Sequence, residues 1–135
     1  MRWASAAAGL VALLVSSCAG ASLTCVSGTR PMTRLELFFG RDVMGREAVS
    51  DEEWRAFLDD EVTPHFPDGF TVTDTYGQWR NAGGSIAMER GKELIVIASA
   101  NAGNASDVAA IRDAYKRRFM QESVLFVQSP ACAAF

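Results

Sequence analysis

The fold of this chain is decided by the stretch from Phe66 to Glu89, which reads FPDGFTVTDTYGQWRNAGGSIAME. The stretch opens with the turn residues Asp68 and Gly69 and then alternates apolar side chains with threonines. This alternation indicates a strand with one apolar and one polar face, as at the edge of a sheet. Residues 81–84 (NAGG) predict a reversal, so the stretch forms a β-hairpin.

The hairpin carries many polar and aromatic side chains, so we expect any specific site to involve it. If its two strands are symmetric about the loop, Trp79 faces Ile86 and Tyr76 faces Glu89. The residues that could form a binding site are therefore Tyr76, Gln78, Trp79 and Glu89, with Arg41 from an earlier loop as a possible anion ligand. A solvated loop arginine and a purely structural Arg41–Glu89 ion pair are the alternatives.

Further strands and helices flank the hairpin. A strand is predicted over residues 34–39 and another over 123–127, and the second hairpin strand continues to Ala98 with a bulge at Gly91. A helix begins at the capping box of Ser50 and Glu53 and ends near Pro64. The apolar spacing after residue 106 predicts a second helix, capped by Asn104 or Ser106.

The order strand, helix, strand, strand, helix, strand is typical of an α+β, ferredoxin-like βαββαβ sandwich. We expect an antiparallel four-stranded sheet in the order four-one-three-two, with two helices on one face. The strands carry apolar residues on both faces, for example Phe38 beside Leu37 and Ile95 beside Val96. The face without helices therefore needs a cover, and a second copy, a ligand or the chain's tails could supply it. We expect a homodimer formed through this face.

The N-terminus carries an export signal. Arg2 is followed by an apolar run over residues 4–15, too short to span a bilayer. The sequence Val15-Ser16-Ser17-Cys18 is similar to a lipobox, which predicts a signal peptide over 1–17 and a lipid anchor on Cys18. We expect the rest of the chain to consist of a tether over 18–30, a single domain over 31–130 and a tail over 131–135. The mature protein would face the periplasm from the bacterial cell envelope. Cleavage after Ala21, giving a soluble periplasmic protein, is the alternative.

The cysteines, the net charge and the single histidine bear on disulfide bonding, nucleic-acid binding, metal binding and catalysis. In an oxidising compartment we expect a disulfide between Cys25 and Cys132, and two free thiols in frayed tails are the alternative. The net charge of −3 argues against a nucleic-acid partner. His65, the single histidine, has no nearby cysteine, and no serine or cysteine can be placed beside it. We therefore expect no metal, no cofactor and no catalytic role for His65.

Several motifs resemble one known family. They are Phe66-Pro67-Asp68-Gly69, Gly77-Gln78-Trp79, Glu89 and Gln121-Glu122-Ser123-Val124, together with the strand end Leu37-Phe38-Phe39-Gly40-Arg41 and the pair Tyr115-Lys116 followed by Phe119. With these residues the chain resembles the bacterial domain-of-unknown-function family 3574 over about residues 31–128. The resemblance implies a small exported or lipid-anchored protein and supplies no catalytic residues.

Two functions agree with the sequence. The first is a non-catalytic binding or assembly module of the cell envelope, suggested by the missing nucleophile–base pair and the second apolar face. The second is a small dimeric enzyme in which Glu89 acts as acid or base, Tyr76 and Gln78 orient a substrate and Arg41 holds an anion. An enclosed polar cavity at Glu89 would favour the enzyme, and a flat packed surface would favour the module.

Overall fold

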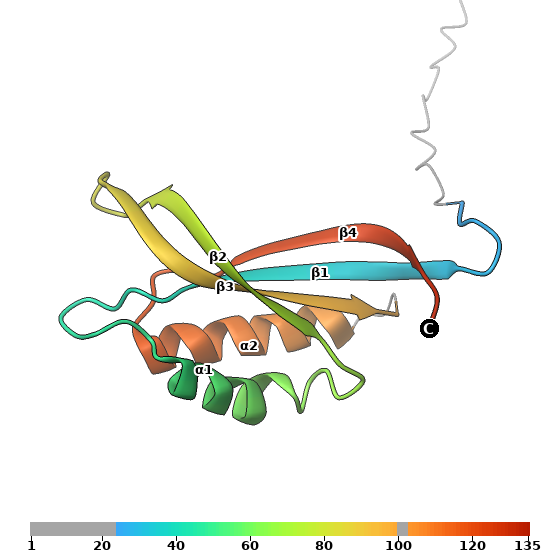
Figure 1. Ribbon diagram of the computed structural model, residues 1–135, viewed down its shortest axis with the longest axis horizontal. Coiled ribbons are helices and arrows are strands. Elements are labelled where there is room, and N and C mark those ends of the chain that lie inside the picture. Colours follow the sequence, from blue (N-terminus) through green and yellow to red (C-terminus); the bar gives the residue numbers. More distant parts are fainter. Residues whose placement is uncertain (1–23, 100–102) are drawn as a thin grey trace, which may run out of the picture.

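The computed structural model describes residues 24–99 and 103–135. Its elements are strand β1 (Arg30–Gly40), helix α1 (Asp51–Phe57), a π-helical turn η1 (Leu58–Val62), strands β2 (Thr71–Arg80) and β3 (Ile86–Ala98), helix α2 (Gly103–Phe119) and strand β4 (Leu125–Ala133). The sheet has the order β2-β3-β1-β4, with every neighbouring pair antiparallel. Both helices lie against one face of the sheet (Figure 1), which confirms the predicted ferredoxin-like sandwich.

The core lies between the helices and the sheet. Leu35, Leu37 and Phe39 project from β1 to the helix side and are fully buried, as the alternation of the strand predicted. Helix α1 begins at Ser50, where the complete predicted capping box is present. The apolar stripe of each helix supplies further core residues: Trp54, Phe57 and Val62 from α1 and η1, and Val108, Ile111, Tyr115 and Phe119 from α2.

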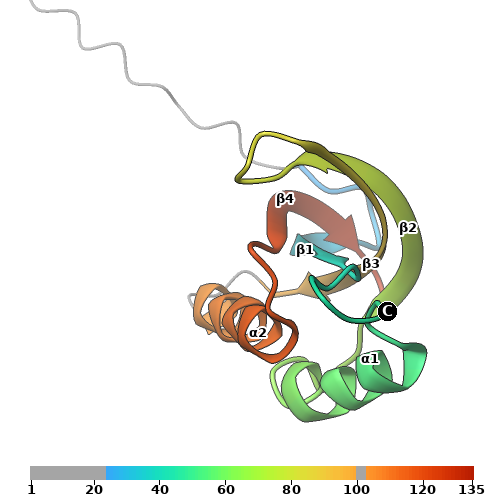
Figure 2. The same cartoon turned by 90° about the vertical axis from the view of Figure 1, so that its left-hand side faces the viewer.

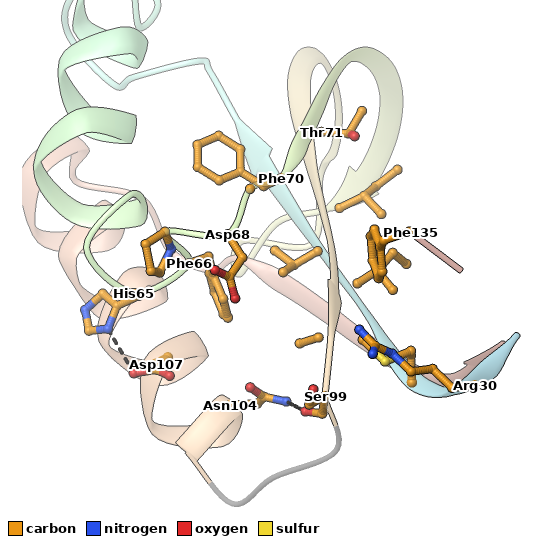
Figure 3. Close-up of a pocket in the computed structure, with 17 residues that line it drawn as sticks. Arg30, His65, Phe66, Asp68, Phe70, Thr71, Ser99, Asn104, Asp107 and Phe135 are labelled. Carbon is orange, nitrogen blue, oxygen red and sulfur yellow. Dashed lines mark hydrogen bonds and ion pairs between the residues drawn. The ribbon is translucent and has the colours of Figure 1, made fainter. Parts of the chain in front are cut away.

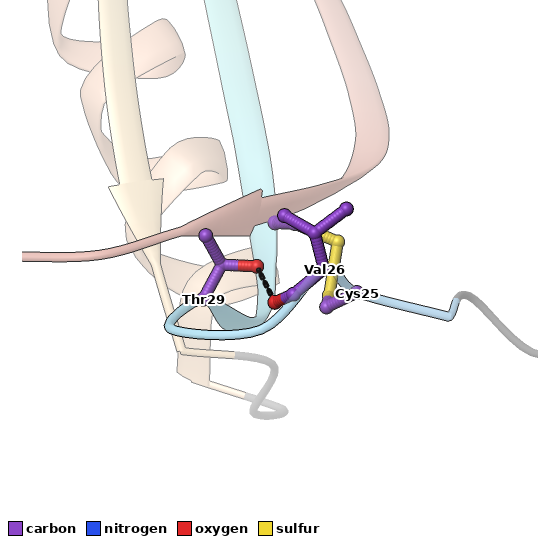
Figure 4. The surroundings of a disulfide bond; sticks show 4 residues. Cys25, Val26 and Thr29 are labelled. Carbon is purple, nitrogen blue, oxygen red and sulfur yellow. Dashed lines mark hydrogen bonds between the residues drawn. A yellow bond between two sulfur atoms is a disulfide. The ribbon is translucent and has the colours of Figure 1, made fainter.

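The segment before β1 is linked to the end of β4 by a disulfide between Cys25 and Cys132, whose Cα atoms are 5.5 Å apart (Figure 4). This confirms the predicted pairing. Thr29 closes the turn beside it by donating to the Val26 carbonyl oxygen at 2.8 Å. The two cysteines are 107 positions apart, so on the chain-entropy model the bond stabilises the fold by about 4–5 kcal/mol.

Several element boundaries differ from the predictions. Strand β4 extends to Ala133, so Cys132 lies in a paired strand and not in a tail. Helix α2 already includes Asn104 and Ser106, so neither caps it. The predicted signal peptide and both cleavage sites lie outside the described residues. Within those residues, no helix is both long and apolar enough to cross a lipid bilayer.

The predicted hairpin exists, but its register is shifted by one residue. Asn81 pairs with Ser85 and Gly84 donates back to the Asn81 carbonyl oxygen, which leaves three residues in the loop. Gly84 takes the left-handed conformation that such a loop requires, with φ of +83°. Trp79 therefore faces Ala87, and Glu89 faces Gly77 and not Tyr76. Because side chains alternate along a strand, Tyr76 and Glu89 project from opposite faces.

The predicted bulge at Gly91 is absent. Gly91 pairs with Gly40 on one side and Thr75 on the other, and both registers continue through it without an extra residue. A Cβ atom at Gly91 would lie 2.8 Å from both the Phe39 carbonyl oxygen and Thr75 Oγ1. The glycine therefore allows a close approach of neighbouring strands.

The face of the sheet away from the helices, here called the open face, is only partly covered. Figure 2 shows the sheet strongly curled, with the β2–β3 hairpin arching away from the helix layer. Phe38, Ile95 and Val127 lie on the open face, and Leu125 there has 60% of its surface exposed. The structure thus fixes which alternating set of apolar residues faces outward, a choice that the sequence alone leaves open.

Candidate functional site

The hairpin end of the open face holds a cavity of about 460 Å³. It lies between the end of β1, the hairpin and the segment that leads into β4. Four of the five predicted site residues line it, namely Tyr76, Gln78, Trp79 and Glu89. The other lining residues are Phe38, Phe39, Gly40, Thr75, Gly77, Gly91, Gln121, Ser123 and Leu125. The motifs on which the family resemblance rests therefore meet, for the most part, in one place.

Three glycines from three strands form the floor of this cavity. Gly40, Gly77 and Gly91 share one face of the sheet, because Gly40 pairs with Gly91 and Gly77 pairs with Glu89. Gly40 lies under Glu89, and a Cβ atom there would come within 2.8 Å of the Glu89 carboxyl carbon. The Tyr115 hydroxyl donates to the Gly40 carbonyl oxygen at 2.8 Å. The core thus holds in place the backbone on which Glu89 rests.

Glu89 is half-buried on this floor. Burial raises the pKa of its carboxyl group, and the nearby charge of Asp42 adds to the rise. The Asp42 backbone N–H, which donates to Glu89 Oε2 at 3.2 Å, works in the opposite direction and lowers the pKa. The net direction is upward. Burial therefore favours the protonated form of this carboxyl group, and a cation bound beside it would favour the carboxylate.

Trp79 lies beside Glu89 on the same face. Its indole N–H is close enough to lower the pKa of the carboxyl group slightly, but it does not reach hydrogen-bond geometry. The indole nitrogen is buried and has no hydrogen-bond partner among the described residues. An N–H left in this way is costly, and Trp54 Nε1 in the core is left in the same way, so the unpaired indole does not by itself mark a site.

The segment after α2 forms one side of the cavity and is hydrogen-bonded to the loop after β1 and to the hairpin loop. Gln121 Nε2 donates to the Asp42 carbonyl oxygen at 2.6 Å, and Glu122 Oε2 accepts from the Ala82 backbone N–H at 3.2 Å. Met120 enters the left-handed region, with φ of 53°, and so turns the chain into this segment. The sequence reasoning assigned no role to Asp42, and it used Gln121 and Glu122 only as part of a family motif.

Three of the predicted site residues lie apart from Glu89: Arg41, Tyr76, and Gln78, which pairs with Met88 at a position whose side chain belongs to the face opposite Glu89. Arg41 donates from Nε to the Val49 carbonyl oxygen at 2.6 Å and contacts Asp51 at 3.0 Å, so it fastens the loop before α1. Tyr76 pairs with Arg90 and reaches the cavity from a strand position whose side chain belongs to the opposite face. Arg41, Tyr76, Arg90 and Glu89 border a smaller hollow of about 310 Å³ on that side. The Arg41–Glu89 ion pair, which was the structural alternative to a binding site, does not form, because Arg41 pairs with Asp51.

A larger cavity of about 730 Å³ lies along the far end of β3 (Figure 3). His65 Nδ1 and Asp107 Oδ1 are 2.9 Å apart at its rim, and Arg30 and Phe135 border its other side. The hydrogen-bond partner that the structure gives His65 is thus a carboxylate. The Glu89 cavity collects four of the five predicted site residues and is therefore the better candidate site.

The arrangement at Glu89 can bind a molecule, and it can accept or donate a proton at one carboxyl group. It does not suit a divalent metal, because the described residues contain no group of three histidine, cysteine, aspartate or glutamate side chains that could hold an ion. The cavity is partly open and has both polar and apolar walls, so it is neither the enclosed polar site nor the flat surface that the two functional hypotheses predicted.

Comparison with solved structures agrees with the fold. A phage SAM lyase in complex with S-methyl-5'-thioadenosine superimposes with a TM-score of 0.61 at 14% identity, covering 84% of this chain and 95% of the lyase. The same type of enzyme in its apo state gives 0.57 at 14% identity, over 85% and 97% of the two chains. At this identity the likeness shows the fold alone. No curated protein matches the sequence.

The family comparison agrees with the sequence motifs. A family model described as a protein of unknown function (DUF3574) matches residues 34–135. This range includes all the strands and helices of the structure except the first four residues of β1. The match contains all the residues that line the Glu89 cavity. The chain belongs to the DUF3574 family of proteins of unknown function.

Proposed function

We propose that this protein is a binding module of the cell envelope that holds a small organic molecule in the Glu89 cavity. The observation that carries the proposal is the cavity itself, a hollow of about 460 Å³ floored by glycines from three strands around a half-buried carboxylate. Its volume falls within the range of known small-molecule sites, about 300–1,000 Å³. A sheet needed only for stability would fill this face with side chains.

Co-purification tests the proposal. We expect native mass spectrometry of the protein purified from its own host to show a bound small molecule. Gly40→Ala should lose this molecule, because the new Cβ atom displaces the Glu89 carboxyl group. Gly83→Ala in the hairpin loop is the matched control, because Gly83 does not line the cavity and a Cβ atom there meets only Asn81 Oδ1, at 3.4 Å. A ligand-free native protein, or equal retention by both variants, would refute the proposal.

We also propose export and lipid anchoring through Cys18. The disulfide between Cys25 and Cys132 supports export, because such bonds persist in oxidising compartments. The expected result is that Cys18→Ala releases the protein from the membrane fraction. A variant that stays bound after a salt wash would contradict the lipid anchor, and a soluble wild type beginning at Ser22 would favour the other cleavage site.

The second candidate is an enzyme that uses Glu89 as acid or base. Two observations favour it: the raised pKa of Glu89, and the fold shared with the phage SAM lyase. The test is incubation of the purified protein with SAM and chromatography for S-methyl-5'-thioadenosine. We expect no release above the uncatalysed background. Release that Glu89→Gln abolishes would replace the binding module with the enzyme.

A further inference from the structure

We infer that the ligand of the Glu89 cavity is an organic cation whose charge is surrounded by apolar groups, such as a quaternary ammonium or a sulfonium ion. This inference rests on the proposed binding function and adds the chemical class of the ligand. It follows from the charge of the lining residues, from the aromatic walls and from the state of the carboxylate.

The lining of the cavity carries one formal charge, that of Glu89. The remaining lining residues are glycines, aromatic and aliphatic residues, hydroxyls and amides. The nearest other charge that affects Glu89 belongs to Asp42, which has the same sign. Arg41 does not compensate Glu89, because it is engaged with Asp51 and the Val49 carbonyl oxygen. An anionic ligand would be repelled, and a cationic ligand would supply the missing partner.

The walls of the cavity favour a cation that gives up its water easily. Phe38 and Trp79 lie on the same face as Glu89, and Leu125 lies across from them on β4. Aromatic faces attract cations, and they do so best when the cation has little hydration to lose. A strongly hydrated ion such as Mg²⁺ needs several oxygen ligands, and this cavity offers a single carboxylate.

Burial works against the ionised form of Glu89 in the empty protein, since it raises the pKa of the carboxyl group. A bound cation would reverse this effect by stabilising the carboxylate. The Asp42 N–H holds Oε2, and Oε1 lies over Gly40 on the cavity floor, so the carboxylate is held in one orientation. The geometry therefore places a single, oriented negative charge at the base of an aromatic-walled hollow.

Two matched pairs of probes test the inference. Choline is compared with its uncharged isostere 3,3-dimethylbutan-1-ol, and SAM with its neutral thioether S-adenosylhomocysteine. Binding is followed on the full-length protein by NMR, at the indole N–H signal of Trp79. We expect at least one cation to bind about tenfold more tightly than its neutral counterpart, and the pair that shows the preference identifies ammonium or sulfonium chemistry.

Variants separate this inference from the proposed function. Glu89→Gln should abolish the preference for the cation, whereas Glu93→Gln should keep it, because Glu93 lies on the same strand and is bound by Thr73. Equal or tighter binding of both neutral probes would overturn the inference. If no probe binds but the native protein carries a co-purified molecule, the inference fails and the binding function stands. If neither probe nor co-purified molecule is found, both fail.

Discussion

The two faces of the sheet use adjacent residues for opposite purposes. Phe39 points to the helices, where its ring lies 4.7 Å from that of Tyr115 and 5.1 Å from that of Trp54. At Gly40, the next residue, a side chain would project to the open face, and its absence leaves room for the Glu89 carboxyl group. The helix face is packed for stability, and the hairpin end of the open face is hollowed. A single strand therefore supplies both the core and the candidate site.

The largest expected effect is on the packed face. Phe39→Ala removes a ring that contacts Trp54, Phe57 and Tyr115, and should lower the free energy of unfolding by about 3–5 kcal/mol. Phe38→Ala, its neighbour on the open face, should cost less than about 2 kcal/mol, because Phe38 is only half-buried. Urea denaturation of both variants measures the difference. Equal losses would mean that the two faces are packed alike.

Gly40→Ala should damage the site more than the fold. The added methyl group displaces the Glu89 carboxyl group, so the affinity for a cationic probe should fall at least about tenfold, which corresponds to about 1.4 kcal/mol. Gly83→Ala should bind normally, because Gly83 lies outside the cavity lining. NMR titration of both variants with choline gives the affinities, and a Gly40→Ala protein with wild-type affinity would show that this glycine has no part in the site.

The rest of the open face should mediate self-association. We propose a homodimer formed through this part, because Val127 is exposed there on the same face as Ile95, outside the lining of the Glu89 cavity. Val127→Lys should raise the dimer dissociation constant by about tenfold or more. Sedimentation at micromolar concentration provides the measurement. Lys116→Ala on helix α2 is the control, and a wild-type monomer without ligand would refute the dimer.

The smallest effect concerns the stability cost of Glu89. Its folded-state pKa is raised, so folding favours the protonated form, and stability should fall as the pH rises through the folded-state pKa. At neutral pH, Glu89→Gln removes this penalty and should raise the Tm by at most about 4 °C. The gain should vanish at a pH below the ordinary glutamate range. A loss of stability at neutral pH would mean that the hydrogen bond from Asp42 outweighs burial.

The order of strands and helices, the core stripes and the disulfide followed from the sequence. These features depend on local periodicity, on capping chemistry and on the compartment that an export signal predicts. Ser50 and Glu53 form the capping box, and Leu35, Leu37 and Phe39 alternate inward, as expected. The residues of the hairpin were also correctly singled out, because their density of polar and aromatic side chains is visible without a fold.

The tertiary structure decided the register of the hairpin, the face that the helices cover and the partner of each charged residue. The hairpin has a three-residue loop with a left-handed Gly84, so Glu89 pairs with Gly77 and not with Tyr76. The alternation of apolar and polar residues does not reveal a register shift of one residue. Arg41 forms an ion pair with Asp51 across a loop. Gly40 and Gly91 have no room for a Cβ atom, because atoms of neighbouring strands occupy that space. Sequence patterns encode what each residue prefers locally, whereas a hollow exists only where separate strands are brought together.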